Sequence, residues 1–75
     1  MYFYTVIENQ MDNDGNFGLL SFHFDNEEEA YSKLYTVLAY ASVSKIQYHS
    51  GHLLRSDGII IDGRVFDRRL PAVEE

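Results

Sequence analysis

The spacing of apolar residues changes at Asp25, and this change constrains the fold more than any other feature of the sequence. Before Asp25, apolar and polar residues alternate in a manner typical of half-buried β-strands. After it, apolar residues recur every three or four positions, as they do along one face of a helix: Ala30, Leu34, Val37, Leu38 and Ala41. The sequence therefore predicts one helix over residues 26–43.

The expected helix start carries three further signals. Asp25 or Asn26 can cap the first free amides, and Glu28 stands three residues after Asp25, as in a capping box. The acidic run at 27–29 suits the positive end of the helix dipole. These signals agree with the apolar pattern on where the helix begins.

Two strands are expected before the helix. Residues 2–9, YFYTVIEN, are rich in β-branched and aromatic side chains. Residues 18–24, GLLSFHF, alternate so that Leu20, Phe22 and Phe24 face inward. The Asp, Asn and Gly residues between them favour a hairpin with a long loop.

Two more strands are expected after the helix, at residues 46–55 and 59–69, joined by an Asp57-Gly58 turn. The second Asp-Gly, at 62–63, favours a glycine bulge within one bent strand, and a three-stranded meander is the alternative. The prediction is an α+β domain over residues 1–70 with the order ββαββ, in which an antiparallel sheet of about four strands packs on one helix. Residues 71–75 are expected to form a flexible acidic tail.

The small size of the chain predicts self-association. A chain of 75 residues buries only roughly 60% of its unfolded surface, and this one has no cysteine to cross-link it. It does carry six tyrosines and five phenylalanines, which one helix cannot cover. We expect a homo-oligomer, a dimer or higher, in which another copy covers the second face of the sheet.

The net charge of −6 argues against an extended nucleic-acid track, which requires a basic surface. The basic residues gather in the last third of the chain, where residues 45–70 contain five of the six. The first residues lack the pattern of a signal peptide, and no apolar run approaches the roughly 20 residues of a membrane span. The expectation is a cytoplasmic protein that does not bind membranes.

The segment YHSGHLLRSDG, residues 48–58, is the best candidate for a site. With the arginines of the last strand it supplies seven candidate ligand-binding residues: Tyr48, His49, Ser50, His52, Arg55, Arg64 and Arg68. Guanidinium groups hold phosphates in two-pronged fashion, and Tyr or His rings stack on a base. This predicts a small phosphorylated, nucleotide-like ligand, provided that Gly51 bends the strand so that the rings meet Arg55 and Arg64. The alternative is that the last arginines, Arg64, Arg68 and Arg69, pair with Asp62, Asp67 or the helix glutamates, as charges on edge strands often do.

Metal binding and catalysis are not expected. The i, i+3 spacing of His49 and His52 sends their rings to opposite faces of an extended strand. Ser50 lies beside His49 but lacks a nucleophile elbow. We predict no catalytic residue, no metal and no cofactor.

The segments LYTVLAYASVSKIQYHSGHLLRSDG and GRVFDRR resemble a group of short uncharacterised proteins encoded by bacteria and their phages or prophages, over most of residues 2–69. The resemblance implies a context, the cytoplasm of a bacterial host, and no site residue. Such proteins are often accessory factors that counter host defence, by binding a defence protein or by sequestering a nucleotide-type signal at an oligomer interface. The leading hypothesis is therefore a non-enzymatic, homo-oligomeric anti-defence factor that sequesters such a signal. The alternative is an inhibitor or adaptor that binds a protein through its acidic surface.

Overall fold

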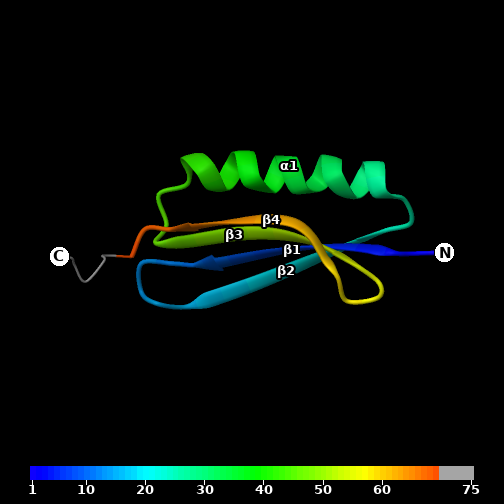
Figure 1. The fold of residues 1–75 in the computed structure, drawn as a ribbon. Helices are drawn as coiled ribbons and strands as arrows, with labels where there is room; N and C mark the ends of the chain where they lie inside the picture. Colours follow the sequence, from blue (N-terminus) through cyan, green and yellow to red (C-terminus); the bar gives the residue numbers. More distant parts are fainter. Residues whose placement is uncertain (70–75) are drawn as a thin grey trace.

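The computed structural model describes residues 1–69 and has four strands and one helix in the order ββαββ (Figure 1). The predicted α+β class and the order of its elements are confirmed. The predicted tail, 71–75, lies outside the described residues. The elements are β1 (Tyr4–Met11), β2 (Phe17–Phe24), α1 (Glu27–Val43), β3 (Tyr48–Arg55) and β4 (Ile60–Asp67).

The four strands form one antiparallel sheet in the order β2-β1-β3-β4. The first and third strands are therefore central, and β2 and β4 are the edges. Helix α1 lies over one face of this sheet, and no described element covers the other (Figure 1). Within residues 1–69, no helix is long and apolar enough to cross a membrane.

The helix begins and ends where its flanking residues leave the helical conformation. Asn26 is extended, and its side-chain oxygen accepts a 2.8 Å hydrogen bond from the backbone N–H of Glu29. Of the two predicted candidates, Asn26 is therefore the N-terminal cap and Asp25 is not. After Val43 the chain turns extended at Ser44, whose N–H still donates to the carbonyl of Ala41.

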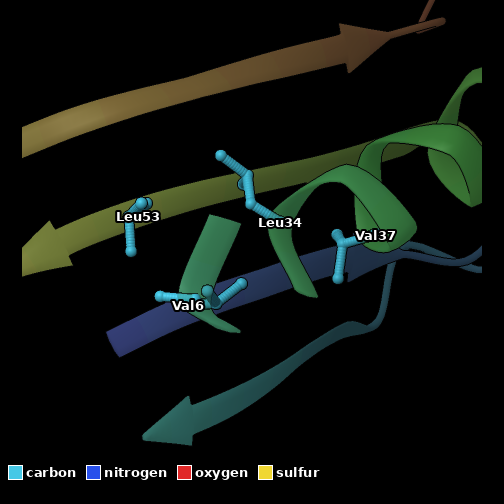
Figure 2. Packing of buried hydrophobic residues seen from close by; sticks show 5 residues of the cluster. Val6, Leu34, Val37 and Leu53 are labelled. Atoms are coloured by element: carbon cyan, nitrogen blue, oxygen red, sulfur yellow. The ribbon is translucent and has the colours of Figure 1, made fainter. Parts of the chain in front are cut away.

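The core forms where the apolar stripe of α1 meets the two central strands. Leu34 and Val37 pack on Val6 of β1 and Leu53 of β3, and Ala30 completes the buried cluster (Figure 2). Leu34, Val6 and Leu53 have no exposed surface. Partly buried side chains from β2 and β4, including Phe22 and Ile61, extend the cluster toward both edges.

Gly51 does not bend β3, contrary to the expectation from the sequence. The strand pairs without interruption from Tyr48 to Arg55 on its β1 side. A Cβ at Gly51 would lie 2.8 Å from Cγ1 of Val37 and 3.2 Å from Cδ2 of Leu38. The glycine therefore allows α1 to approach the sheet closely, and it does not redirect the strand.

The last strand is one bent element, as the sequence predicted in preference to a three-stranded meander. Leu53 pairs with Asp62 and Leu54 with Ile60, so Ile61 is the extra residue of a bulge. The bulge thus precedes the predicted Asp62-Gly63 position. Gly63 has a packing role instead, because a Cβ there would collide with the ring of His52 and lie 2.8 Å from the carbonyl oxygen of Gly51.

A turn joins β3 and β4 at the predicted place, but three residues, Ser56, Asp57 and Gly58, form it where a two-residue Asp57-Gly58 turn was expected, and Gly58 has a φ of 91°. The N–H of Gly58 donates to the carbonyl of Arg55, and the N–H of Arg55 donates to the carbonyl of Ile59. This positive φ is the conformation that glycine adopts without strain, which explains its place after Asp57.

Candidate functional site

The sheet separates the seven predicted ligand-binding residues. Successive side chains of a regular strand point to opposite faces. Because β3 is regular, His49 and Arg55 lie on the helix face with Arg64, which pairs with Gly51. Tyr48, Ser50 and His52 lie on the uncovered face. One copy of the chain therefore does not bring the predicted set together.

Arg55 is held by its neighbour in the turn. Its Nε and Nη2 atoms donate to the two carboxylate oxygens of Asp57 at 3.0 and 2.7 Å, and its guanidinium lies 4.3 Å from the ring centre of Tyr2. This bidentate pair raises the pKa of Arg55 and lowers that of Asp57. The fork that was expected to hold a phosphate is thus occupied by a carboxylate.

Arg68 follows β4 and binds the end of α1. Its Nη2 donates to the backbone carbonyls of Ala41 at 2.8 Å and Ser42 at 3.2 Å. The last turn of α1 contains no basic residue of its own. Arg68 therefore supplies the cation that the negative end of this helix otherwise lacks.

Arg64 is exposed on the edge strand, with its guanidinium 5.7 Å from the ring centre of Phe66. Nearby, Arg69 pairs with Asp67 at 2.7 Å, and the hydrogen bonds from Arg69 lower the pKa of Asp67 to about 2. Among residues 1–69, the ion pairs of arginine are those of Arg55 and Arg69. Of the three arginines that the alternative paired with acids, Arg69 does so, whereas the pair of Arg55 with Asp57 was not expected.

His49 belongs to a buried polar pair with Glu8. Its Nε2 lies 2.6 Å from Oε2 of Glu8, and its ring has no exposed surface. Gln10 donates to the same oxygen at 3.0 Å, and the ring of Tyr40 packs edge-on against the imidazole. A fully buried ring cannot meet a substrate or ligand, so His49 acts here in the packing of the sheet against α1.

The sequence analysis missed Glu8, although a signal for it exists. Glu8 has the same parity as Val6 in β1, so it points toward the helix face, where an acid needs a buried partner. The register then places Gln10 opposite His49 and Glu8 on the diagonal from it. The pairing of β1 with β3 was not predicted, and without it the partner could not be identified.

On the uncovered face, Tyr48 lies between two other side chains. The ring of Phe17 meets it edge-on at 6.0 Å, and the guanidinium of Arg69 lies 5.1 Å from its centre. Ser50 is buried and His52 half-buried in the same strand. Tyr48, Ser50 and His52 are therefore the predicted site residues that share the uncovered face.

Two hollows on the described surface are lined by carboxylates without lysine or arginine. The first, here the hairpin hollow, measures about 440 Å³ and lies beside the β1–β2 loop. Glu8 and Asp12 supply its carboxylates. Its lining residues are Glu8, Gln10, Asp12, Asn16, Phe17, Gly18, Leu19, Leu20 and Ile46.

The second, here the helix hollow, measures about 560 Å³ and lies along the first turns of α1. It is lined by Glu27, Glu28, Tyr31, Ser32 and Tyr35. The rings of Tyr31 and Tyr35 lie 5.6 Å apart. Partial burial raises the pKa of Tyr31, and the negative charges of Asp62 and Glu27 add to this effect.

Among residues 1–69, no three His, Cys, Asp or Glu side chains are grouped closely enough to hold a metal ion. No family model, curated protein or solved structure matches the chain. The resemblance to short phage and bacterial proteins therefore stays a prediction, and inferences about function depend on the geometry described above.

Proposed function

We propose that the chain is a non-enzymatic binding protein that engages a basic segment of another protein through the helix hollow, and so acts as an inhibitor or adaptor. The main observation in support of this proposal is that two glutamates lie beside a pair of tyrosines in the helix hollow. A host defence protein, the kind of partner that the resemblance implies, would be one such target.

The chemistry of the helix hollow suits a lysine or arginine side chain. The carboxylates of Glu27 and Glu28 can accept hydrogen bonds from a cationic head, and tyrosine faces attract cations that lie over them. Tyr35 is 58% exposed, so its ring is available to a partner. Tyrosine is also among the residues that contribute most to protein interfaces.

The distribution of charge supports a basic partner over an anionic one. Arg55 and Arg69 are paired with aspartates, and Arg68 is bound to helix carbonyls. None of the three glutamates at the start of α1 takes part in an ion pair with another described residue. The acidic side of the molecule is therefore open to complementary charge, which also speeds association at low salt.

Calorimetry with a Lys/Arg-rich peptide as the probe tests this proposal. We expect binding that weakens as salt is added, and we expect Glu28→Lys to weaken it about tenfold, or about 1.4 kcal/mol. Asp14→Lys is the matched control, because it makes the same change of charge on the exposed hairpin loop. Equal affinities for the two variants, or no binding by the unmodified protein, would contradict the proposal.

A second candidate function is the sequestration of a nucleotide-type signal between two copies. It is favoured by the group on the uncovered face, where Tyr48 and His52 offer rings and Arg69 lies over Tyr48. Two such faces brought together would form a site that one copy lacks. Calorimetry against linear and cyclic nucleotides at high protein concentration tests it, and heat that Tyr48→Ala abolishes is the expected result. An absence of heat across the panel would rule it out.

A further inference from the structure

The outer edge of β2 lacks the features that keep an edge strand from pairing. The strand runs for eight residues in continuous register with β1, without a bulge, a proline or a charged Asp, Glu, Lys or Arg. Phe17, Leu19 and Leu20 are 60, 63 and 52% exposed. An exposed, regular, apolar edge of this kind is a template for another strand.

The opposite edge, β4, is protected in two ways. Its pairing with β3 is interrupted by the bulge at Ile61. It also carries Asp62, Arg64 and Asp67, whose charges oppose the approach of a second strand. The contrast between the two edges indicates that β2 has a partner and that β4 does not.

We infer that two copies of this chain join through β2, each strand pairing antiparallel with the other across a two-fold axis perpendicular to the sheet. The product is a continuous eight-stranded sheet with both helices on the same side. A two-fold axis makes the same patch serve both copies, so the patch must be complementary to itself. An uncharged strand meets this condition, even though each copy has a net charge of −6.

One charge beside β2, that of Lys33, is complementary to the other copy across this axis, whereas Asp25 of one copy would lie near the acidic hairpin loop of the other. On the helix face, Nζ of Lys33 lies 4.0 Å from the ring centre of Phe22. The two β2 strands can pair in two registers. If the axis passes through Leu20, Phe22 of the second copy lies opposite Gly18. If the axis passes through Ser21, Phe22 of the second copy lies opposite Leu20. Both Gly18 and Leu20 line the hairpin hollow. In either register, Lys33 of one copy therefore approaches the hollow that contains Glu8 and Asp12 of the other.

The second copy is favoured over a strand from an unrelated protein because it brings this lysine with it. The pairing leaves the helix hollow free, since every residue that lines this hollow belongs to α1 and none belongs to β2. Dimerisation through β2 and binding of a basic partner are therefore separate properties, and either can fail without the other.

Sedimentation and native mass spectrometry of the whole chain test the inference through matched variants. Leu20→Lys places two lysines at the axis or one residue from it, according to the register, and we expect it to raise the dimer dissociation constant at least tenfold. Val65→Lys, an equally drastic change on the uncovered face near the β4 edge, should leave the dimer intact. Lys33→Glu should weaken the dimer, whereas Lys45→Glu, an exposed change in the loop after α1, should not.

Cross-linking gives a second measurement that does not depend on a destabilising substitution. The chain has no cysteine, so Ser21→Cys introduces one thiol near the proposed axis. Paired strands bring facing Cα atoms within the distance that a disulfide spans. We expect a disulfide-linked dimer on oxidation of Ser21→Cys if the pair is centred on Ser21, or of Leu20→Cys if it is centred on Leu20, and none from Ile60→Cys on β4. A protein that stays monomeric at all concentrations, or a dimer that Val65→Lys dissociates while Leu20→Lys does not, would overturn the inference.

Discussion

Glu8 and His49 are 41 residues apart in the chain, and their side chains meet at 2.6 Å beneath the end of α1. The pair joins the two central strands at the point where the apolar core gives way to polar groups. Nδ1 of His49 is already buried without a partner among the described residues. The fold therefore depends on Glu8 to satisfy the other nitrogen of that ring.

Glu8→Ala should lower the free energy of unfolding by about 1–3 kcal/mol, the usual effect of leaving a buried polar group without its partner. Denaturant unfolding measures the loss. Gln10→Ala is the control, because Gln10 bonds the same carboxylate but is only partly buried, so its removal should cost less. An unchanged stability of Glu8→Ala would show that the pair does not hold the strands.

Gly51→Ala should destabilise the protein by about 1–3 kcal/mol, as overpacking does in a closed core. The new Cβ would lie 2.8 Å from Cγ1 of Val37, and either the helix or the strand must move. Gly18→Ala is the matched control, because a Cβ there meets no atom within 4 Å. Combining Gly51→Ala with Val37→Ala should cost less than the sum of the two changes. Additive losses would contradict the close contact.

Arg68→Ala should loosen the last turn of α1, because the carbonyls of Ala41 and Ser42 lose their donor. Hydrogen exchange of the amides in this turn measures the effect, and those near Leu34 serve as the internal reference. We expect faster exchange at the end of the helix alone. If the amides at the end of α1 exchange at the same rate in the variant and in the unmodified protein, the capping role is excluded.

Asp67 should titrate near pH 2, because the hydrogen bonds from Arg69 lower its pKa from 3.8 to about 2. A lowered folded-state pKa stabilises the protein above the unfolded value, so this contribution is present above about pH 4 and is lost as the pH falls toward 2. The carboxyl carbon shift in a pH titration by NMR reports the pKa, and Arg69→Ala should return it toward 3.8. A midpoint that does not move in the variant would contradict the pair.

The sequence was sufficient to predict the elements because each had a local signal. The apolar stripe from Ala30 to Ala41 defined the helix, and the alternation in residues 18–24 defined the second strand. Gly51 was misinterpreted because a glycine within a strand has two explanations, a bend or a close neighbour. Only the position of Val37 in space distinguishes them.

The candidate site was harder to predict, because it depends on which strands are neighbours. The alternation of side chains along a strand places Tyr48 and His49 on opposite faces. The expected bend at Gly51 was taken to override this alternation. Arg55 and Arg69 pair with acids that are close to them in sequence. Arg68 instead binds two carbonyls of α1 that are 27 and 26 residues before it in the chain. A contact of that range follows from the packing of β4 beside the helix, and no local pattern shows it.

The most direct test of the account is an NMR titration of the isotope-labelled protein, first with a Lys/Arg-rich peptide and then with a panel of nucleotides. The account predicts that the peptide shifts the amide signals of Glu27, Glu28, Tyr31 and Tyr35, and that nucleotides leave the signals of Arg55 and Arg64 in place. Peptide-induced shifts that are absent from the helix hollow, or nucleotide-induced shifts centred on Arg55 and Arg64, would contradict it.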